Sequence, residues 1–227
     1  MDEKAHGTLH AVSESIIKCR KCPRLYSYIR EVGKHRVKRF AEEDYWARPV
    51  SGLGDPYAKL VVVGLAPAAH GGNRTGRMFT GDSSGQWLMR ALFETGFANI
   101  PSSESKYDGL VLRNVYVTSI LRCAPPLNKP LASEIRNCSR YLQAELALLE
   151  SNFIVIITLG RVAFERLCAH YGLKGLNFSH GACFKFDEKY LIASYHPSRQ
   201  NTNTLRLKWE MWISIFRKAR TIITSST

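Results

Sequence analysis

The sequence predicts a three-layer α/β/α fold with a central, mostly parallel four-stranded sheet. Residues 60–63 (LVVV) form an uninterrupted apolar run, which is typical of a strand buried on both faces of a parallel sheet. Similar runs alternate with amphipathic segments of helical period, and this alternation implies parallel strands joined by right-handed crossovers. The 227 residues, 45% of them hydrophobic, suit one core, so residues 1–227 are predicted to form a single domain.

The first half of the chain supplies two helices, one buried strand and a crossover helix. Apolar residues recur with helical period over residues 8–18, and a second helix is predicted from Pro23 to about Gly33. Residues 42–57 are expected to be a loop because proline and glycine interrupt any periodicity. After the strand at 60–63, a helix is predicted over 84–97, with Asp82 or Ser83 as its N-cap and Gly96 at its end.

The second half repeats this alternation and ends in a helix. The expected elements are strands at 110–121 and 153–159, helices at 133–149 and 161–171, a hairpin-like pair at 184–186 and 190–194, and a closing helix at 204–219. The carboxyl ends of parallel strands lie at one edge of a sheet. The loops that start at Gly64, Arg122 and His196 are therefore expected to converge into one cleft.

Composition narrows the classes of partner. The formal charge is +13 and the sequence pI is about 9.6, which favours a polyanionic partner, nucleic acid above all. No run of 18 apolar residues offers a membrane span, and the N-terminus has no secretory signal pattern. The protein is therefore expected to be intracellular and cytoplasmic, where six cysteines are more typical of metal binding than of disulfides.

Four cysteines form a candidate metal site. Cys19 and Cys22 make a C-x2-C turn, while Cys123 and Cys138 are separated by 14 residues. Thiolates bind either zinc or an iron–sulfur cluster, and the long second spacing favours the cluster, with zinc as the less favoured occupant. Such a site would tie the N-terminal segment and the prolyl loop that follows Cys123 to the sheet. The other two, Cys168 and Cys183, are interpreted as core residues.

The loop after the first strand, residues 64–82, is rich in glycine and shaped for close contact with a ligand. It lacks the Gly-Lys-Ser/Thr of a phosphate loop, and its glycine spacing does not match a dinucleotide fingerprint. A small-molecule α/β enzyme that binds a nucleotide here is therefore disfavoured, both by the missing motifs and by the basic charge.

The same loop, GLAPAAHGGNRTGRMFTGD, together with HPS at 196–198 and the four cysteines, resembles the uracil-DNA glycosylase superfamily. Within the superfamily the chain is similar to the iron–sulfur-containing family 5 enzymes, from Cys19 to the helix after His196. The resemblance implies a monomeric, monofunctional DNA-repair glycosylase. Such an enzyme hydrolyses the N-glycosidic bond of uracil and related damaged bases flipped out of duplex DNA, and carries a 4Fe–4S cluster on the four cysteines.

The resemblance also implies roles for individual residues. Phe79 is expected to stack on the base, and His196 to donate a hydrogen bond toward the base's O2. Ala68 and Ala69 stand where many superfamily members carry an acidic or amide side chain, so Asp82 becomes the candidate that orients or deprotonates water, with Asn128 assisting. The expected substrate-lining residues are Ala66, His70, Asn73 and Ser119, and the expected DNA contacts are Arg74, Arg77, Ser198, Arg199 and Gln200.

Two alternatives remain open at this point. Ala68 and Ala69 are compatible with a non-catalytic iron–sulfur DNA-binding module. The other alternative is a strict, uracil-only enzyme of the family 4 kind. Against it, Ser119 stands where family 4 enzymes carry an asparagine that reads the edge of uracil, which suggests weaker pyrimidine discrimination and a wider range of bases.

Overall fold

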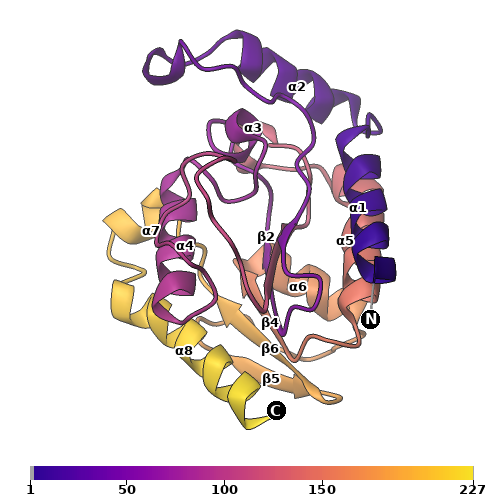
Figure 1. Cartoon of the computed structure of the whole chain (residues 1–227), viewed down its shortest axis with the longest axis vertical. Coiled ribbons are helices and arrows are strands. Elements are labelled where there is room, and N and C mark those ends of the chain that lie inside the picture. Colours follow the sequence, from indigo (N-terminus) through magenta and orange to yellow (C-terminus); the bar gives the residue numbers. More distant parts are fainter. Residues whose placement is uncertain (1–2, 227) are drawn as a thin grey trace.

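The computed structural model describes residues 3–226 of the chain (Figure 1). The strands are β1 (Leu53–Gly54), β2 (Leu60–Gly64), β3 (Val115–Ser119), β4 (Val155–Leu159), β5 (Cys183–Phe186) and β6 (Lys189–Ser194). The α-helices are α1 (Glu3–Ile17), α2 (Pro23–Lys34), α3 (Gly72–Thr75), α4 (Ser83–Glu94), α5 (Ala132–Leu149), α6 (Arg161–His170), α7 (Arg199–Asn203) and α8 (Trp209–Ser225). Two 3-10 turns complete these elements, η1 (Lys38–Phe40) and η2 (Pro126–Asn128).

The strands form one sheet in the order β1-β3-β2-β4-β6-β5. The inner strands β3, β2, β4 and β6 are parallel, and the edge strands β1 and β5 are antiparallel to their neighbours. The predicted class is therefore confirmed, but the predicted number of four strands is wrong, because the sheet has six. The short strand β1 escaped the prediction because it is only two residues long and lies inside the glycine- and proline-rich stretch assigned to a loop.

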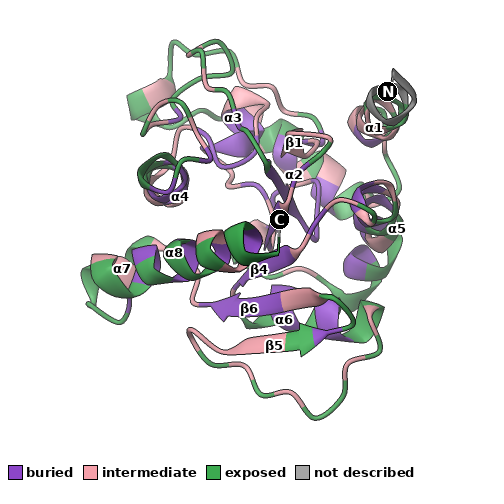
Figure 2. Cartoon of the chain, turned by 60° about the horizontal axis from the view of Figure 1, so that its bottom comes forward, coloured by how far each residue is buried: buried purple, intermediate pink, exposed green. Residues whose placement is uncertain are grey.

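Helices cover both faces of the sheet. Strand β2 alternates between them: Leu60 and Val62 belong to the core under α4 and α8, whereas Val61 and Val63 belong to the core under α1, α5 and α6. All four are fully buried, and Figure 2 shows the buried residues on the strands and on the inward sides of the helices. Because β2 is apolar on both faces, it can only lie at the centre of such a sheet.

Several predicted boundaries shift in the structure. The strand predicted at 110–121 is limited to β3. The closing helix predicted at 204–219 begins and ends later, as α8, and a short helix that was not predicted, α7, precedes it. The break between these helices contains Leu205, whose φ of 57° is left-handed and cannot continue a helix. The predicted N-cap of α4 is confirmed, because the Asp82 side chain accepts a hydrogen bond from the backbone N–H of Gly85.

No helix among residues 3–226 has both the length and the apolar character needed to span a bilayer.

Candidate active site

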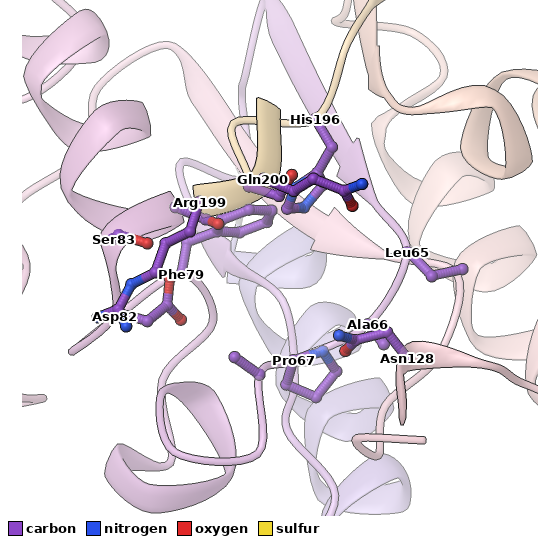
Figure 3. Close-up of a pocket in the computed structure, with 13 residues that line it drawn as sticks. Leu65, Ala66, Pro67, Phe79, Asp82, Ser83, Asn128, His196, Arg199 and Gln200 are labelled. Carbon is purple, nitrogen blue, oxygen red and sulfur yellow. The ribbon is translucent and has the colours of Figure 1, made fainter. Parts of the chain in front are cut away.

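A cavity of about 470 Å³ lies at the edge where the loops after β2, β3 and β6 meet the start of α4 (Figure 3). This volume falls within the roughly 300–1,000 Å³ of ligand pockets. The predicted convergence of the three loops is confirmed. The cavity is lined by Leu65, Ala66, Pro67, Ala68, Phe79, Asp82, Ser83, Ser84, Asn128, His196, Ser198, Arg199 and Gln200.

Phe79 forms one wall of the cavity and is held in a strained conformation. Its φ of 48° is left-handed, which is rare for an aromatic residue. The ring lies against Gly64 at the end of β2, where an added Cβ would come within 2.7 Å of the ring. At Gly85 of α4, an added Cβ would come within 2.3 Å of the Phe79 carbonyl oxygen. Both glycines therefore make room for the aromatic face that borders the cavity.

His196 lies two residues beyond the end of β6, and its ring faces Phe79. The two ring centroids are 6.4 Å apart, with 28° between the ring planes. The Asn201 side-chain amide donates to the His196 carbonyl at 2.8 Å, which fixes the backbone of the loop. Burial lowers the pKa of His196 to about 4, so the imidazole is neutral at pH 7. A neutral ring can donate a hydrogen bond into the cavity without carrying a charge.

Asp82 combines an N-cap role with a position on the cavity wall. Its Oδ1 accepts from the Gly85 N–H at 2.9 Å. Its Oδ2 lies over Gly71, where an added Cβ would be only 2.1 Å away, so the carboxylate needs a glycine at that position. Burial raises the pKa of Asp82, although hydrogen bonds from the backbone of Gly85 and Ser84 oppose the shift. A carboxylate with a raised pKa is a better proton acceptor.

Asn128 reaches the cavity from the opposite side, on the prolyl loop. Leu127 and Asn128 both have left-handed backbones, with φ of 53° and 56°. The Asn128 side chain has no hydrogen-bond partner among the described residues, and Figure 3 shows its amide at the cavity beside Ala66. An amide with free donors and acceptors can bind substrate or water.

A second cavity, of about 720 Å³, adjoins the first and shares Ala68, Asp82, Ser83, Asn128 and Arg199 with it. Its far wall includes Arg39 and Phe40 of η1, so the segment after α2 extends the active-site hollow into a longer groove. His70 lines this second cavity rather than the first. A His70 ring nitrogen lies 3.0 Å from the Tyr45 hydroxyl, and burial followed by the Arg74 charge lowers the pKa of His70.

Two residues expected to line the substrate site are buried away from both cavities. Asn73 is 1% exposed, and its amide donates to the Ile29 carbonyl at 3.1 Å, which ties α2 to the glycine-rich loop. Ser119 is fully buried and donates to the Leu121 carbonyl at 2.6 Å. Neither side chain reaches the hollow, so the structure assigns both to holding the loops in place.

The two arginines expected to bind phosphates are committed to internal contacts. Arg74 pairs with Glu43, donates to the carbonyls of His70 and Gly81, and stacks on Phe40 at 3.9 Å. The following arginine, Arg77, donates to Thr80, Ser103 and Asp108, with the distance to Asp108 Oδ2 being 2.5 Å. Against the effect of burial, the hydrogen bonds from Arg77 and from the Leu110, Glu104 and Ser105 backbones lower the pKa of Asp108 to about 2. These arginines therefore brace the loops.

The loop after His196 lines the cavity as expected. Ser198 caps α7 by accepting from the Asn201 N–H at 3.3 Å, while Arg199 and Gln200 are exposed at the rim. Sequence reasoning missed Ser84, whose hydroxyl donates to the Pro197 carbonyl at 3.0 Å and so joins α4 to this loop. Its position at the start of α4, two residues after Asp82, was the available signal.

The four predicted ligand cysteines, which lie far apart in the sequence, line one small cavity. Cys19 follows α1, Cys22 precedes α2, Cys123 follows β3 and Cys138 lies on α5. All six cysteines are free thiols, and Cys168, interpreted as a core residue, is buried. Within residues 3–226, no three His, Cys, Asp or Glu side chains are arranged to hold a single metal ion.

Fold and cavity together define a class of protein. It is an α/β domain whose parallel strands deliver an aromatic wall, a neutral imidazole and a buried carboxylate to one cavity large enough for a nucleobase. The family model described as the uracil DNA glycosylase superfamily matches residues 51–219. The chain belongs to that superfamily.

Named relatives lie within the same superfamily. The chain is 47% identical over 213 residues to a type-5 uracil-DNA glycosylase of Thermus thermophilus, covering 92% of this chain and 96% of the relative. It is 45% identical over 204 residues to one of Pyrobaculum aerophilum, covering 90% and 88%. A type-4 uracil-DNA glycosylase of Archaeoglobus fulgidus is 28% identical over 198 residues, covering 84% and 82%. These matches favour neither the non-catalytic module nor the family 4-like enzyme.

Proposed function

We propose that this protein removes uracil from DNA by hydrolysing the N-glycosidic bond of a nucleotide rotated out of the duplex, leaving an abasic site. The observation that carries the proposal is the single cavity shared by Phe79, His196 and Asp82. Extruding a nucleotide costs a few kcal/mol, which a close-fitting base pocket must offset. The high identity to type-5 uracil-DNA glycosylases points to the same reaction.

In the proposed mechanism, each cavity residue has one task. The ring of Phe79 stacks on the extruded base. Neutral His196 donates a hydrogen bond to O2 of the base, where negative charge develops as the bond breaks. The carboxylate of Asp82 orients and deprotonates the water that attacks C1′, and stabilises the positive charge that forms on the sugar. Asn128 holds the substrate or this water.

The proposed DNA contacts lie at the rim of the groove. Arg199 lines both cavities. Its guanidinium makes no ion pair or hydrogen bond to a described residue, so it is available for a phosphate. Gln200 and the backbone at Ser198 extend this surface. The protein acts as a monomer in this proposal, since one chain carries the whole set of cavity residues.

We propose that the base range extends beyond uracil to related damaged bases. Ser119 stands where family 4 enzymes carry the asparagine that reads the edge of uracil. Its hydroxyl donates to the Leu121 carbonyl and does not reach the cavity. No polar side chain at the end of β3 then selects one base by hydrogen bonding. The cavity selects bases mainly by their shape, and every planar base can stack on Phe79.

The occupant proposed for the cysteine cavity is a 4Fe–4S cluster. Four free thiols at one cavity suit either a cluster or zinc. The long spacing between Cys123 and Cys138 favours the cluster over zinc. When bound, the cluster would cross-link the N-terminal helices to the prolyl loop that carries Asn128.

The test is excision from a duplex oligonucleotide with one uracil, measured as strand cleavage at the abasic site after alkali. The wild-type protein is expected to generate abasic sites, and His196→Ala to lower the rate by roughly 10²–10³-fold because one preorganised donor is lost. His10→Ala, which removes an exposed histidine on α1, serves as the matched control. Absence of abasic product with the wild-type protein, or an undiminished rate for His196→Ala, contradicts the proposal. Ethenocytosine and hypoxanthine substrates then test the base range.

A further inference from the structure

Arg122 is a buried charge that the proposed reaction does not use. It lies directly before Cys123 and is 1% exposed. Its Nη2 donates to Glu145 Oε2 and its Nη1 to Thr118 Oγ1, both at 2.6 Å. Glu145, also 1% exposed, accepts further bonds from the hydroxyls of Thr118 at 2.6 Å and Tyr116 at 3.1 Å. The two Nη groups of Arg122 are thus held in a hydrogen-bonded network with Glu145 and the side chains of Tyr116 and Thr118 on β3.

The Nε atom of this guanidinium is buried and has no hydrogen-bond partner among the described residues. An unsatisfied buried donor costs about 1–3 kcal/mol, so such a group in a native fold calls for a partner that the protein itself does not supply. Arg122 also lines the small cavity shared by the four cysteines.

Other donors beside this cavity already point at cysteine sulfur. The backbone N–H of Arg122 hydrogen-bonds to Cys138, and the Asn137 amide donates to Cys22 Sγ at 3.7 Å. Donors directed at sulfur are the usual surroundings of thiolates that bind metal, because ligated sulfur keeps negative charge. The orphaned Nε–H belongs to a residue that lines the same cavity.

We propose that the Nε–H of Arg122 donates a charge-assisted hydrogen bond to a sulfur of the iron–sulfur cluster held by the four cysteines. The inference rests on the cluster of the proposed function. Arg122 is then a positioning residue. Glu145 fixes its guanidinium, and the guanidinium in turn would stabilise the negative charge of the cluster. Hydrogen bonds to cluster sulfur raise the reduction potential, because they favour the more negative, reduced state.

The experiment compares reduction potentials in anaerobically purified full-length protein. Arg122→Lys keeps a positive charge opposite Glu145 but removes the Nε–H donor. Arg24→Lys is the matched control, because Arg24 is also ion-paired, to Glu134 at 2.8 Å, but does not line the cysteine cavity. Potentiometric titration is expected to give a more negative potential for Arg122→Lys and an unchanged potential for Arg24→Lys. Equal potentials in Arg122→Lys and wild type, at equal iron and sulfide content, overturn the inference.

A second measurement tests the inference if Arg122→Lys fails to hold the cluster, because it keeps Arg122 in place. The protein is labelled with 15N at arginine Nε and carries Arg20→Lys and Arg140→Lys, which remove the other arginines beside the cysteines. Pulsed EPR of the reduced cluster is expected to show a coupled 15N, and its absence overturns the inference. Wild-type protein that binds zinc or no metal overturns the cluster and the inference together, whereas uracil excision tests the glycosylase proposal separately.

Discussion

Replacing Asp82 separates its two roles, because asparagine and alanine remove different functions. In the structure the carboxylate both caps α4, through Gly85 N–H, and lines the base cavity. Asparagine caps a helix about as well as aspartate but cannot act as a general base. Alanine can neither cap the helix nor act as a general base. Asp82→Asn therefore tests the proton acceptor, and Asp82→Ala adds the loss of the cap.

The expected magnitudes differ for rate and for stability. Loss of a general base lowers the rate by roughly 10²–10⁴-fold in both variants. Loss of the cap costs about 1 kcal/mol in Asp82→Ala only, which for a chain of this size corresponds to about 2–4 °C in Tm. Burial raises the folded-state pKa of Asp82, so the ionised carboxylate costs stability at neutral pH. Asp82→Asn is therefore expected to melt no lower than wild type.

The assay is single-turnover uracil excision with enzyme in excess, together with thermal unfolding of all three proteins. We expect two slow variants, of which only Asp82→Ala has a lowered Tm. Wild-type excision by a folded Asp82→Asn protein would refute the catalytic role and leave Asp82 as a helix cap alone.

Three further predictions follow from the same geometry. The kcat/KM of wild type is expected to fall on the acid side through the raised pKa of Asp82, above the roughly 3.9 of an ordinary aspartate. His196, with its pKa of about 4, is neutral on the plateau at neutral pH. A pH–rate profile checks this, and an acid limb at the same pH in Asp82→Asn contradicts the assignment to Asp82. Arg199→Gln is expected to weaken DNA binding and to reduce the slope of log K against log salt by about one. Arg166→Gln, on the exposed side of α6, is expected to leave both the affinity and the slope unchanged. Equal slopes for Arg199→Gln and wild type, measured by fluorescence anisotropy, contradict a phosphate contact. Gly71→Ala is expected to displace the Asp82 carboxylate, because the new Cβ would lie 2.1 Å from Oδ2; excision by a folded variant at the wild-type rate contradicts this placement.

Local sequence patterns were sufficient to predict the parts of the fold that depend on burial. The uninterrupted apolar run of β2 predicted a central strand, and parallel pairing then required the loops at Gly64, Arg122 and His196 to meet. The N-cap of α4 was predictable because Asp82 directly precedes a helical pattern. These features depend on neighbours in the chain and on the rule that parallel strands end together.

Features that depend on distant contacts were not predictable in this way. Nothing in the local sequence shows that the Asn73 amide binds a carbonyl of α2, or that Arg74 and Arg77 each form an ion pair with an acidic residue of another segment. The prediction treated these side chains as free because they lie in a glycine-rich loop. The two-residue strand β1 escaped for a related reason, since its pairing partner β3 is distant in the chain.

The most direct test of the central claim is a crystal structure of the Asp82→Asn protein bound to a duplex with one uracil. We predict the uracil in the cavity, stacked on Phe79, with its O2 within hydrogen-bond distance of the His196 ring. A uracil that remains stacked in the duplex, or a nucleotide bound elsewhere while this cavity stays empty, would contradict the account.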